Sequence, residues 1–469
     1  MTTQPSDAVT KASDHNAGQK ALQPMLRRLL ALPPGWPLGL LLVGYPVFWA
    51  LGLSEFATDI MAIPMAIELF RRRKIRLPKG FGLWLLFLLW SALGIFVLGV
   101  NPRGTVPDSA SSRLLAYSVR EISYIAVTIV MLYLGNLTTK RVPQAKVVRW
   151  LGYFFIATVA GGVLGMLAPT FNFTSPFEMA LPGSIRSNSY VQHLVHPAAA
   201  QVQEVISDAS ARPAAPFAYT NAWGFHVTLL GVWFVAGWLV KAKSGARIVS
   251  TLILATGFVT LIYSLNRGAW IGVGIAVLFI AVRLALRGRA TVLISLALAM
   301  ALSGGIFYAS PLKSVVEARL DNGKSDDIRA FTTIKAFELS LESPVIGFGS
   351  TRTAYGSSAS IAVGKSASCP QCGNPPIGIN GYMYMLLMST GYVGAALFFG
   401  LWAVQVWRAR RLHSPTAVAG TLVMIMTSVY GFFYDAATWM LVPFVTVGLL
   451  WREVSESGPV RDTPAEGRG

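Results

Sequence analysis

The sequence has few charged residues for its length. Charged side chains make up 13% of the 469 residues and hydrophobic ones 54%, which is far from the balance of a soluble protein. Lys and Arg outnumber Asp and Glu by 39 to 21, but they lie in short runs between apolar segments. This placement excludes a nucleic-acid partner and predicts a polytopic membrane protein with membrane lipids around it.

Cysteine is nearly absent. Cys369 and Cys372 form the motif CPQC in a long polar insert, Pro311 to Gly378, which contains no His. A zinc site therefore lacks its further ligands, and a redox role lacks the preceding strand. In an oxidising compartment such a pair most often closes a small loop as a disulfide, which we expect here.

Phosphate-binding loops are also missing. No GxxxxGK[ST] motif occurs in any segment predicted to be cytoplasmic, so an ATP-driven pump or a kinase is excluded. We expect no cofactor, and the energy for any reaction must come from the substrate or from a gradient.

What the sequence does have is a series of apolar runs near the 20 residues that a membrane span needs. They predict an all-α fold with about twelve transmembrane helices. The first two are short and contain Pro46 and Pro64, which favours tilted or kinked helices. The runs are Leu38–Leu53, Ala57–Phe70, Phe81–Val100, Ile122–Leu137, Trp150–Leu167, Asn221–Val240, Ile248–Ser264, Ala269–Ala285, Thr291–Tyr308, Gly381–Val404, Ala417–Phe433 and Trp439–Trp451.

Five connections between these runs are basic and contain no acid, and short loops of this kind stay in the cytoplasm. They are Arg71–Lys79, Lys140–Arg149, Lys241–Arg247, Arg283–Arg289 and Arg408–Arg411. The alternate loops hold most of the acids and are expected outside: Ser54–Phe56, Pro102–Arg120, Thr170–Phe217, Leu265–Arg267, Pro311–Gly378 and Tyr434–Thr438. This places both termini in the cytoplasm and the protein in the cytoplasmic membrane.

The resulting organisation begins with a polar tail that has no apolar signal-peptide region. A large extracytoplasmic loop separates helices nine and ten. The expected segments are a cytoplasmic tail at 1–24, helices one to nine at 25–310 with an outer loop at 169–218, the extracytoplasmic loop at 311–378, helices ten to twelve at 379–451, and a cytoplasmic tail at 452–469.

Arginines on the outer side are the first candidate functional residues. Arg267 lies between two apolar runs too close for a real loop, so its guanidinium is expected at the outer membrane surface. There it either snorkels to lipid headgroups or clamps an anion, because a guanidinium binds phosphate bidentately. Arg212 and Asn221 lie at the approach to the helix predicted at Asn221–Val240. An Asn at the start of a helix is often simply an N-cap.

The polar insert carries further candidates. Ser325-Asp-Asp-Ile-Arg329 predicts the start of an amphipathic helix over 326–342, which Pro344 ends. The glycines Gly347 and Gly349 predict a tight turn whose exposed N–H groups cradle an oxyanion. At Asn380 the next helix begins, and its Met and Tyr stripe is more typical of packing than of a site.

Together these segments resemble the O-antigen ligase and O-antigen polymerase superfamily. The matching segments occur in the same order as in the family and extend from about Arg212 to Gly394. The first five predicted helices resemble the family in topology only. They are Arg212 to Asn221, Ser264 to Trp270, Arg329 with Glu342 to Gly349, and Asn380-Gly-Tyr382 to Gly394.

One position departs from that pattern. Ligases of the family carry a His before the last Asn, thought to deprotonate the acceptor hydroxyl, and here Ile379 takes its place. An Ile cannot accept a proton, so either the base lies elsewhere or its role is dispensable. The substitute candidates are His193, His196, Glu342, Asp326 and Asp327.

The resemblance implies a metal-independent glycosyltransferase of the polymerase or ligase type. Its donor would be a glycan linked through diphosphate to a polyprenyl lipid, and its acceptor a hydroxyl of a second glycan or lipid. Arg212, Arg267 and Arg329 would stabilise the diphosphate leaving group, with Asn221, Gly347, Gly349, Asn380 and Tyr382 binding substrate. The alternatives are a secondary transporter or flippase of a lipid-linked or anionic substrate, and a family member without catalysis.

Overall fold

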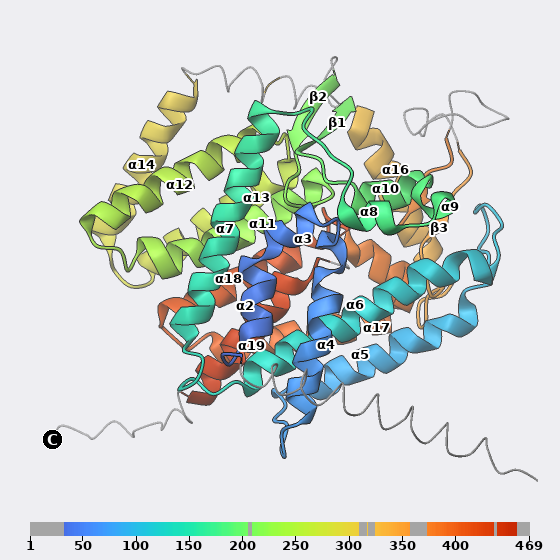
Figure 1. Ribbon diagram of the computed structural model, residues 1–469, viewed down its shortest axis with the longest axis horizontal. Coiled ribbons are helices and arrows are strands. Elements are labelled where there is room, and N and C mark those ends of the chain that lie inside the picture. The colour runs from blue at the N-terminus through green and yellow to red at the C-terminus, as the bar shows by residue number, and fades with distance from the viewer. Residues whose placement is uncertain are drawn as a thin grey trace, which may run out of the picture.

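The computed structural model describes residues 32–204, 209–308, 317, 324–356, 373–435 and 439–456, and these are mostly helical (Figure 1). Six helices in these residues are long and apolar enough to cross a membrane, which identifies a multi-pass membrane protein. They are α6 (Ala110–Asn136), α7 (Gln144–Leu167), α11 (Thr220–Phe234) with its continuation η3 (Val235–Leu239), α12 (Ser244–Tyr263), α13 (Arg267–Ala285) and α17 (Tyr382–Ala409).

The expected count of twelve spans is not confirmed, because only these six helices in the described residues meet the requirements of length and apolar character. Among the others, α5 with η2 and α18 are apolar but shorter. The bounds are α2 (Trp36–Val43), α3 (Tyr45–Ala50), η1 (Ser54–Phe56), α4 (Ala57–Phe70), α5 (Phe81–Leu93), η2 (Gly94–Val97), α14 (Ala290–Tyr308), α18 (Pro415–Tyr430) and α19 (Leu441–Glu456).

Two predicted boundaries are wrong. The run Leu38–Leu53 is not one helix, because Pro46 has no N–H to donate to the Leu42 carbonyl and the chain divides at Gly44 into α2 and α3. Helix α6 begins at Ala110, well before the predicted Ile122, and the Ser109 hydroxyl caps it by accepting from the Ser112 N–H at 3.3 Å. Much of the expected outer loop 102–120 is therefore helix.

Loops from the acid-free basic runs lie together, and we call this side the basic end. The Asn136 amide donates to the Arg76 carbonyl at 2.9 Å, and Gln405 donates to the Lys79 carbonyl at 2.8 Å. Arg452 reaches the carbonyl of Val142 at 2.7 Å. The loop between α4 and α5 projects from this end at the bottom of Figure 1. Three of the five acid-free runs, Arg71–Lys79, Lys140–Arg149 and Arg408–Arg411, therefore lie at or beside this end of the helical body.

At the opposite end lie the short elements that connect the long helices, including β1, β2 and α10 at the top of Figure 1. Two small antiparallel sheets join an otherwise helical fold, and in the first Gln201 pairs with Arg212. The elements are α8 (Pro176–Ala180), α9 (Gly183–Arg186), α10 (Ser189–Val195), β1 (Ala200–Glu204), β2 (Ala209–Pro213), α16 (Lys324–Ser340), β3 (Arg352–Thr353) and β4 (Pro376–Ile377). Cys369 and Cys372 lie outside the described residues.

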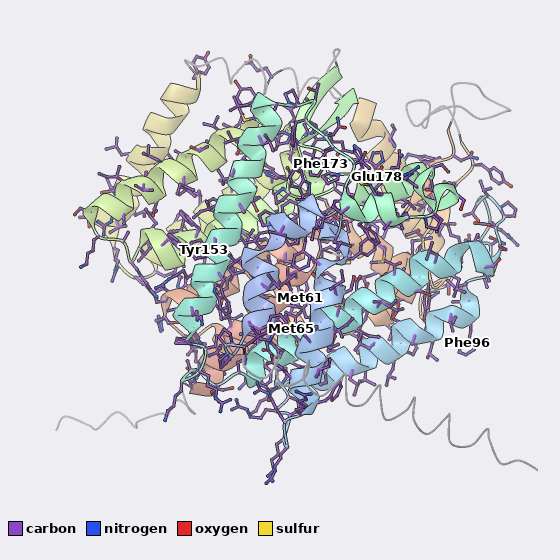
Figure 2. The ribbon with its side chains drawn as sticks, in the orientation of Figure 1. Met61, Met65, Phe96, Tyr153, Phe173 and Glu178 are labelled. Carbon is purple, nitrogen blue, oxygen red and sulfur yellow. The ribbon has the colours of Figure 1, made fainter. Side chains whose placement is uncertain are left out.

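Helix α19 forms the centre of the core and packs against α6 and α18. Its residues from Leu441 to Arg452 are all buried. A Cβ at Gly135 would lie 1.9 Å from the Trp451 ring, so only a glycine lets α6 approach α19 this closely. Figure 2 shows Met61 and Met65 inside the protein, whereas Phe96, 82% exposed, points outward.

Helix α17 is interrupted at Gly391, whose backbone is left-handed at φ 67°. The break leaves the carbonyls of Met388 and Ser389 open to other donors, and the N–H groups of Phe348 and Gly349 donate to them at 2.7 and 2.9 Å. The N–H of Gly347 donates to Ser343 at 3.0 Å. The prediction of exposed N–H groups at Gly347 and Gly349 is therefore wrong, because this turn uses them to close the helix break.

Replacing Gly349 with Ala tests this packing. The φ of Gly349 is 74°, and an added Cβ would lie 2.1 Å from the Gly94 carbonyl oxygen. The left-handed backbone costs about 1–2 kcal/mol, and the overlap adds about 1–3 kcal/mol. The matched control is Gly104→Ala, with φ 76° and no atom within 4 Å of its Cβ. Thermal unfolding in detergent is expected to show a clearly larger loss of Tm for Gly349→Ala, and equal losses would contradict the packing role.

Candidate functional site

Asn266 joins three segments at the end opposite the basic loops. Its Oδ1 accepts a hydrogen bond from the Tyr434 hydroxyl at 2.7 Å and one from the Ala269 N–H at 3.3 Å. Its Nδ2 donates to Asn221 Oδ1 at 3.4 Å. Both Asn266 and Tyr434 are buried. The starts of α11 and α13 and the loop after α18 therefore meet at one buried amide.

The start of α17 joins the same group. The backbone N–H of Tyr382 donates to the Tyr434 carbonyl at 2.7 Å, and that of Met383 donates to the Gly431 carbonyl at 2.9 Å. Each helix N-terminus carries a partial positive charge from its aligned peptide dipoles. Three such N-termini, of α11, α13 and α17, meet at Asn266 and Tyr434 and add partial positive charge to this region.

Arg212 is buried beside these N-termini. Its Nε donates to the Ser264 carbonyl at 2.7 Å, and its own carbonyl accepts from the Thr220 hydroxyl at 3.2 Å. The next residue, Leu265, holds a left-handed backbone with φ 53°, which is strained for a branched side chain. That strained turn aims the Ser264 carbonyl at the guanidinium and fixes it in place.

The charges of two predicted arginines act on one hydroxyl. Burial raises the pKa of Tyr434, and the positive charges of Arg212, on β2, and Arg329, on α16, oppose that rise. Arg329 is exposed on its helix, and Arg267 is half-buried directly after Asn266. The structure thus brings Arg212 and Arg329 into electrostatic reach of Tyr434. Arg267 directly follows Asn266, the residue that accepts from the Tyr434 hydroxyl.

The helix caps of this region differ from the predicted ones. Asn221 is not an N-cap, because α11 begins at Thr220 after the uncapped Tyr219. The cap is Asn266, on α13. A Cβ at Gly224 would lie 2.3 Å from Asn266 Nδ2, so a glycine is required where α11 passes this amide.

Asn380 and Tyr382 have structural partners. The Asn380 amide donates to the Thr332 hydroxyl and ties α16 to the start of α17. Tyr382 is completely buried, and its hydroxyl donates to the Thr427 carbonyl at 2.7 Å. The prediction that Tyr382 contacts substrate is therefore wrong, because the side chain packs in the core. The neighbouring Met and Tyr stripe is likewise packed, as predicted: Tyr384, Met385 and Met388 are buried.

The histidines proposed as substitute bases differ in their surroundings. The Nδ1 of His196 lies 2.7 Å from Glu178 Oε2, and its Nε2 lies 3.1 Å from Asn172 Oδ1. Through these contacts of both ring nitrogens, His196 links two loop segments. The ring of His193 stacks on Tyr219 with centroids 6.0 Å apart.

Among the acidic candidates, Glu342 is exposed and accepts from the Arg103 N–H at 3.4 Å. The side chains of Asp326 and Asp327 lie outside the described residues. Ile379 is 39% exposed and offers no proton acceptor.

Glu55, in η1, is a carboxyl that the sequence did not mark as a candidate base. Burial raises its pKa, and hydrogen bonds from the Ala218 backbone and the Trp439 side chain oppose that rise. Its Oε1 is buried and has no hydrogen-bond partner in the described part of the chain. Trp439 lies 6.4 Å from the Phe225 ring, which lies 5.8 Å from the Tyr434 ring. The buried carboxyl of Glu55 thus lies at the same end of the protein as Arg212. The rings of Trp439 and Phe225 connect it to Tyr434.

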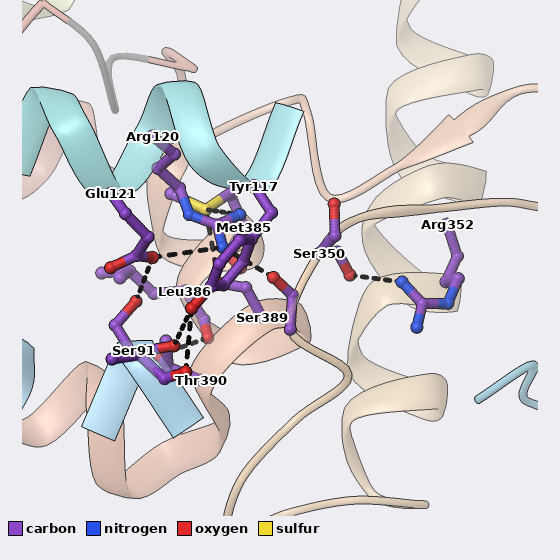
Figure 3. A network of polar contacts seen from close by, with 12 residues as sticks. Ser91, Tyr117, Arg120, Glu121, Ser350, Arg352, Met385, Leu386, Ser389 and Thr390 are labelled. Carbon is purple, nitrogen blue, oxygen red and sulfur yellow. Dashed lines mark hydrogen bonds and ion pairs between the residues drawn. The ribbon is translucent and has the colours of Figure 1, made fainter. Parts of the chain in front are cut away.

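Other arginines at this end hold backbone carbonyls (Figure 3). Arg120 donates to the Gly349 carbonyl at 2.6 Å and lies 3.6 Å from the Glu121 carboxylate. Arg352 donates to the carbonyls of Phe348 and Ser350, both at 2.9 Å. Burial lowers the pKa of Arg352 to about 10, so it stays charged at neutral pH. These two side chains secure the turn that closes the α17 break.

No protein-family model matches this sequence, and no curated protein matches it. In the described residues, no three His, Cys, Asp or Glu side chains group together as metal ligands.

Asn266→Ala tests whether this amide joins the segments. It removes the cap of α13, worth about 1 kcal/mol, and leaves the buried Tyr434 hydroxyl without its acceptor, which costs about 1–3 kcal/mol. Asn266→Asp keeps both accepting interactions and is expected to restore most of the loss. Thermal unfolding of the purified full chain measures both. Equal stability of wild type and Asn266→Ala would show that the amide does not join the segments.

Proposed function

We propose that this protein is a membrane glycosyltransferase of the O-antigen ligase and polymerase type. It moves a glycan from a polyprenyl diphosphate carrier to an acceptor hydroxyl at the outer face of the cytoplasmic membrane. The observation that supports this most is the group around Tyr434, where the charges of Arg212 and Arg329 and three helix N-termini act together. This group lies at the end away from the basic loops, where the positive-inside bias makes arginines least expected.

The positive charges gathered around Tyr434 suit a diphosphate group. As the acceptor oxygen bonds to the anomeric carbon, the bond from that carbon to the diphosphate oxygen breaks, and its electron pair stays on the diphosphate. Positive groups already fixed in place stabilise that developing charge without reorganising. Arg212 is fixed in this way by the Ser264 carbonyl, and Arg267 and Arg329 add charge from α13 and α16.

The acceptor hydroxyl must lose its proton in the same step. With Ile379 in place of the family's His, Glu55 is the carboxyl that fits this role. Its raised pKa makes it a stronger base than an ordinary Glu, and its unpartnered Oε1 is able to accept a proton.

A transporter has weaker support. It calls for ionisable residues deep in several spans, and on α11 that residue is His226. That side chain is buried against Phe217 with ring centroids 4.4 Å apart, and its Nδ1 lies 2.8 Å from the Ala222 carbonyl. His226 therefore packs within the helix bundle.

Substitution of the arginines tests the proposal. Arg212→Ala and Arg329→Ala are each expected to lower glycan transfer by roughly 10²- to 10³-fold, the loss seen on removing one stabilising donor. The control is Lys335→Ala on α16, since Lys335 is exposed and pairs with Glu338 at 2.6 Å. The assay uses the full chain in liposomes with a polyprenyl diphosphate-linked glycan. Wild-type transfer by folded Arg212→Ala and Arg329→Ala would contradict the proposal, and transbilayer movement without transfer would favour the transporter.

Glu55→Gln tests the base. A protonated carboxyl cannot accept the acceptor's proton, so wild-type transfer should rise as pH passes through the raised pKa of Glu55 and level off above it. Glu55→Gln is expected to lower the rate by roughly 10²-fold or more and to remove that rise. Glu342→Gln, at an exposed carboxyl, serves as the comparison. If Glu342→Gln abolished the pH dependence and Glu55→Gln kept it, the base would be Glu342.

A further inference from the structure

A large apolar pocket lies between α11 with η3, α12, α13 and α18, and the transfer chemistry does not use it. Its volume is about 730 Å³. The walls are almost entirely aliphatic and aromatic, and they include Val235, Leu254, Phe258, Val273, Ile280 and Leu422. A pocket of this size and lining suits a hydrocarbon chain.

The few charged side chains of the pocket all lie at one end. Arg287 and Arg289, in the loop after α13, line its mouth together with His413. Arg283 donates to the Leu412 carbonyl at 3.0 Å and so ties α13 to the loop before α18. These loops belong to the acid-free basic runs. The mouth therefore opens at the basic end of the protein.

The depth of the pocket corresponds to one leaflet. On α18 its lining runs from Pro415 to Met426, which is about 17 Å at 1.5 Å per residue, and half of a hydrocarbon core is about 15 Å. Thr228, Leu261 and Met426 line the far side. Neither Arg212 nor Asn266 lines it, so the pocket stops short of the group around Tyr434.

We propose that the pocket binds an acyl chain of an anionic phospholipid from the leaflet at the basic end, with the headgroup phosphate held by Arg287 and Arg289. Both arginines are exposed, and guanidinium groups bind phosphate bidentately. Basic pockets between transmembrane helices on the cytoplasmic side are suited to anionic headgroups. The polyprenyl donor does not fit this pocket, because its diphosphate belongs at the opposite end. The lipid site exists whether or not the protein transfers glycan.

The test measures lipid retention by native mass spectrometry on the delipidated full chain, with added phosphatidylglycerol or phosphatidylcholine of identical acyl chains. Wild type is expected to retain phosphatidylglycerol preferentially. Arg287→Gln with Arg289→Gln should reduce that preference by roughly tenfold. The control, Lys140→Gln with Arg141→Gln, removes the same charge from exposed residues at the basic end and should keep the preference.

A second pair of variants tests the pocket walls. Ala276 lines the pocket, and Ala276→Phe should lower retention of both lipids by filling it. The control is Gly274→Phe on the same helix, where an added Cβ meets no atom within 4 Å, and it should leave retention unchanged. No preference in wild type, or equal losses in the two charge variants, would overturn the proposal. Retention of undecaprenyl diphosphate that Ala276→Phe abolishes and that Arg287→Gln with Arg289→Gln leaves unchanged would assign the pocket to the donor instead.

Discussion

The hydrogen bond from the Tyr434 hydroxyl to Asn266 is the contact on which the candidate site depends. Asn266 caps α13 and reaches Asn221 on α11, while the backbone of Tyr434 accepts from the first turn of α17. Each helix N-terminus leaves N–H groups without partners inside the helix, and burying them in a bilayer without partners is costly. One amide and one loop satisfy several of them together, and this concentrates positive potential at a single place.

The same requirement explains why so many arginines at this end hold backbone carbonyls. A helix break within a membrane protein exposes carbonyl groups that water cannot reach. The break at Gly391 is closed by the N–H groups of residues 348 and 349, and Arg120 and Arg352 hold the carbonyls of that turn. A guanidinium offers five donors in a rigid plane, so one side chain replaces several missing partners. These arginines are structural, although composition alone does not separate them from those near Tyr434.

The sequence predicted what depends on local pattern. Apolar length located α4 and most of α14, and the acid-free runs located the basic end. Pro46 favoured a kink in the first run but did not place the division at Gly44. The early start of α6 was not predicted, because Arg113 and Arg120 look like loop residues in the sequence and are buried against other segments only in the fold. Among site residues, Asn before an apolar run is the usual N-cap signal. It was applied to Asn221, which is not a cap, and not to Asn266, which is one. Tyr434 carried no local signal, since its role arises only where three distant segments meet.

The arginines of the two ends differ in how they are held, and this difference fits the two functions proposed for them. Arg212 is buried and bound to the Ser264 carbonyl beside a strained backbone turn, so its charge is fixed, as the proposed stabilisation of a leaving group requires. Arg287 and Arg289 are exposed at the rim of an apolar pocket, and an exposed side chain on a loop adapts to a lipid phosphate at low cost. A net charge of +18 therefore does not describe one binding surface. The proposed catalysis requires preorganised charge, whereas the proposed anchoring to a leaflet requires charge that is accessible, and arginines of these two kinds lie near opposite ends of the same helix, α13.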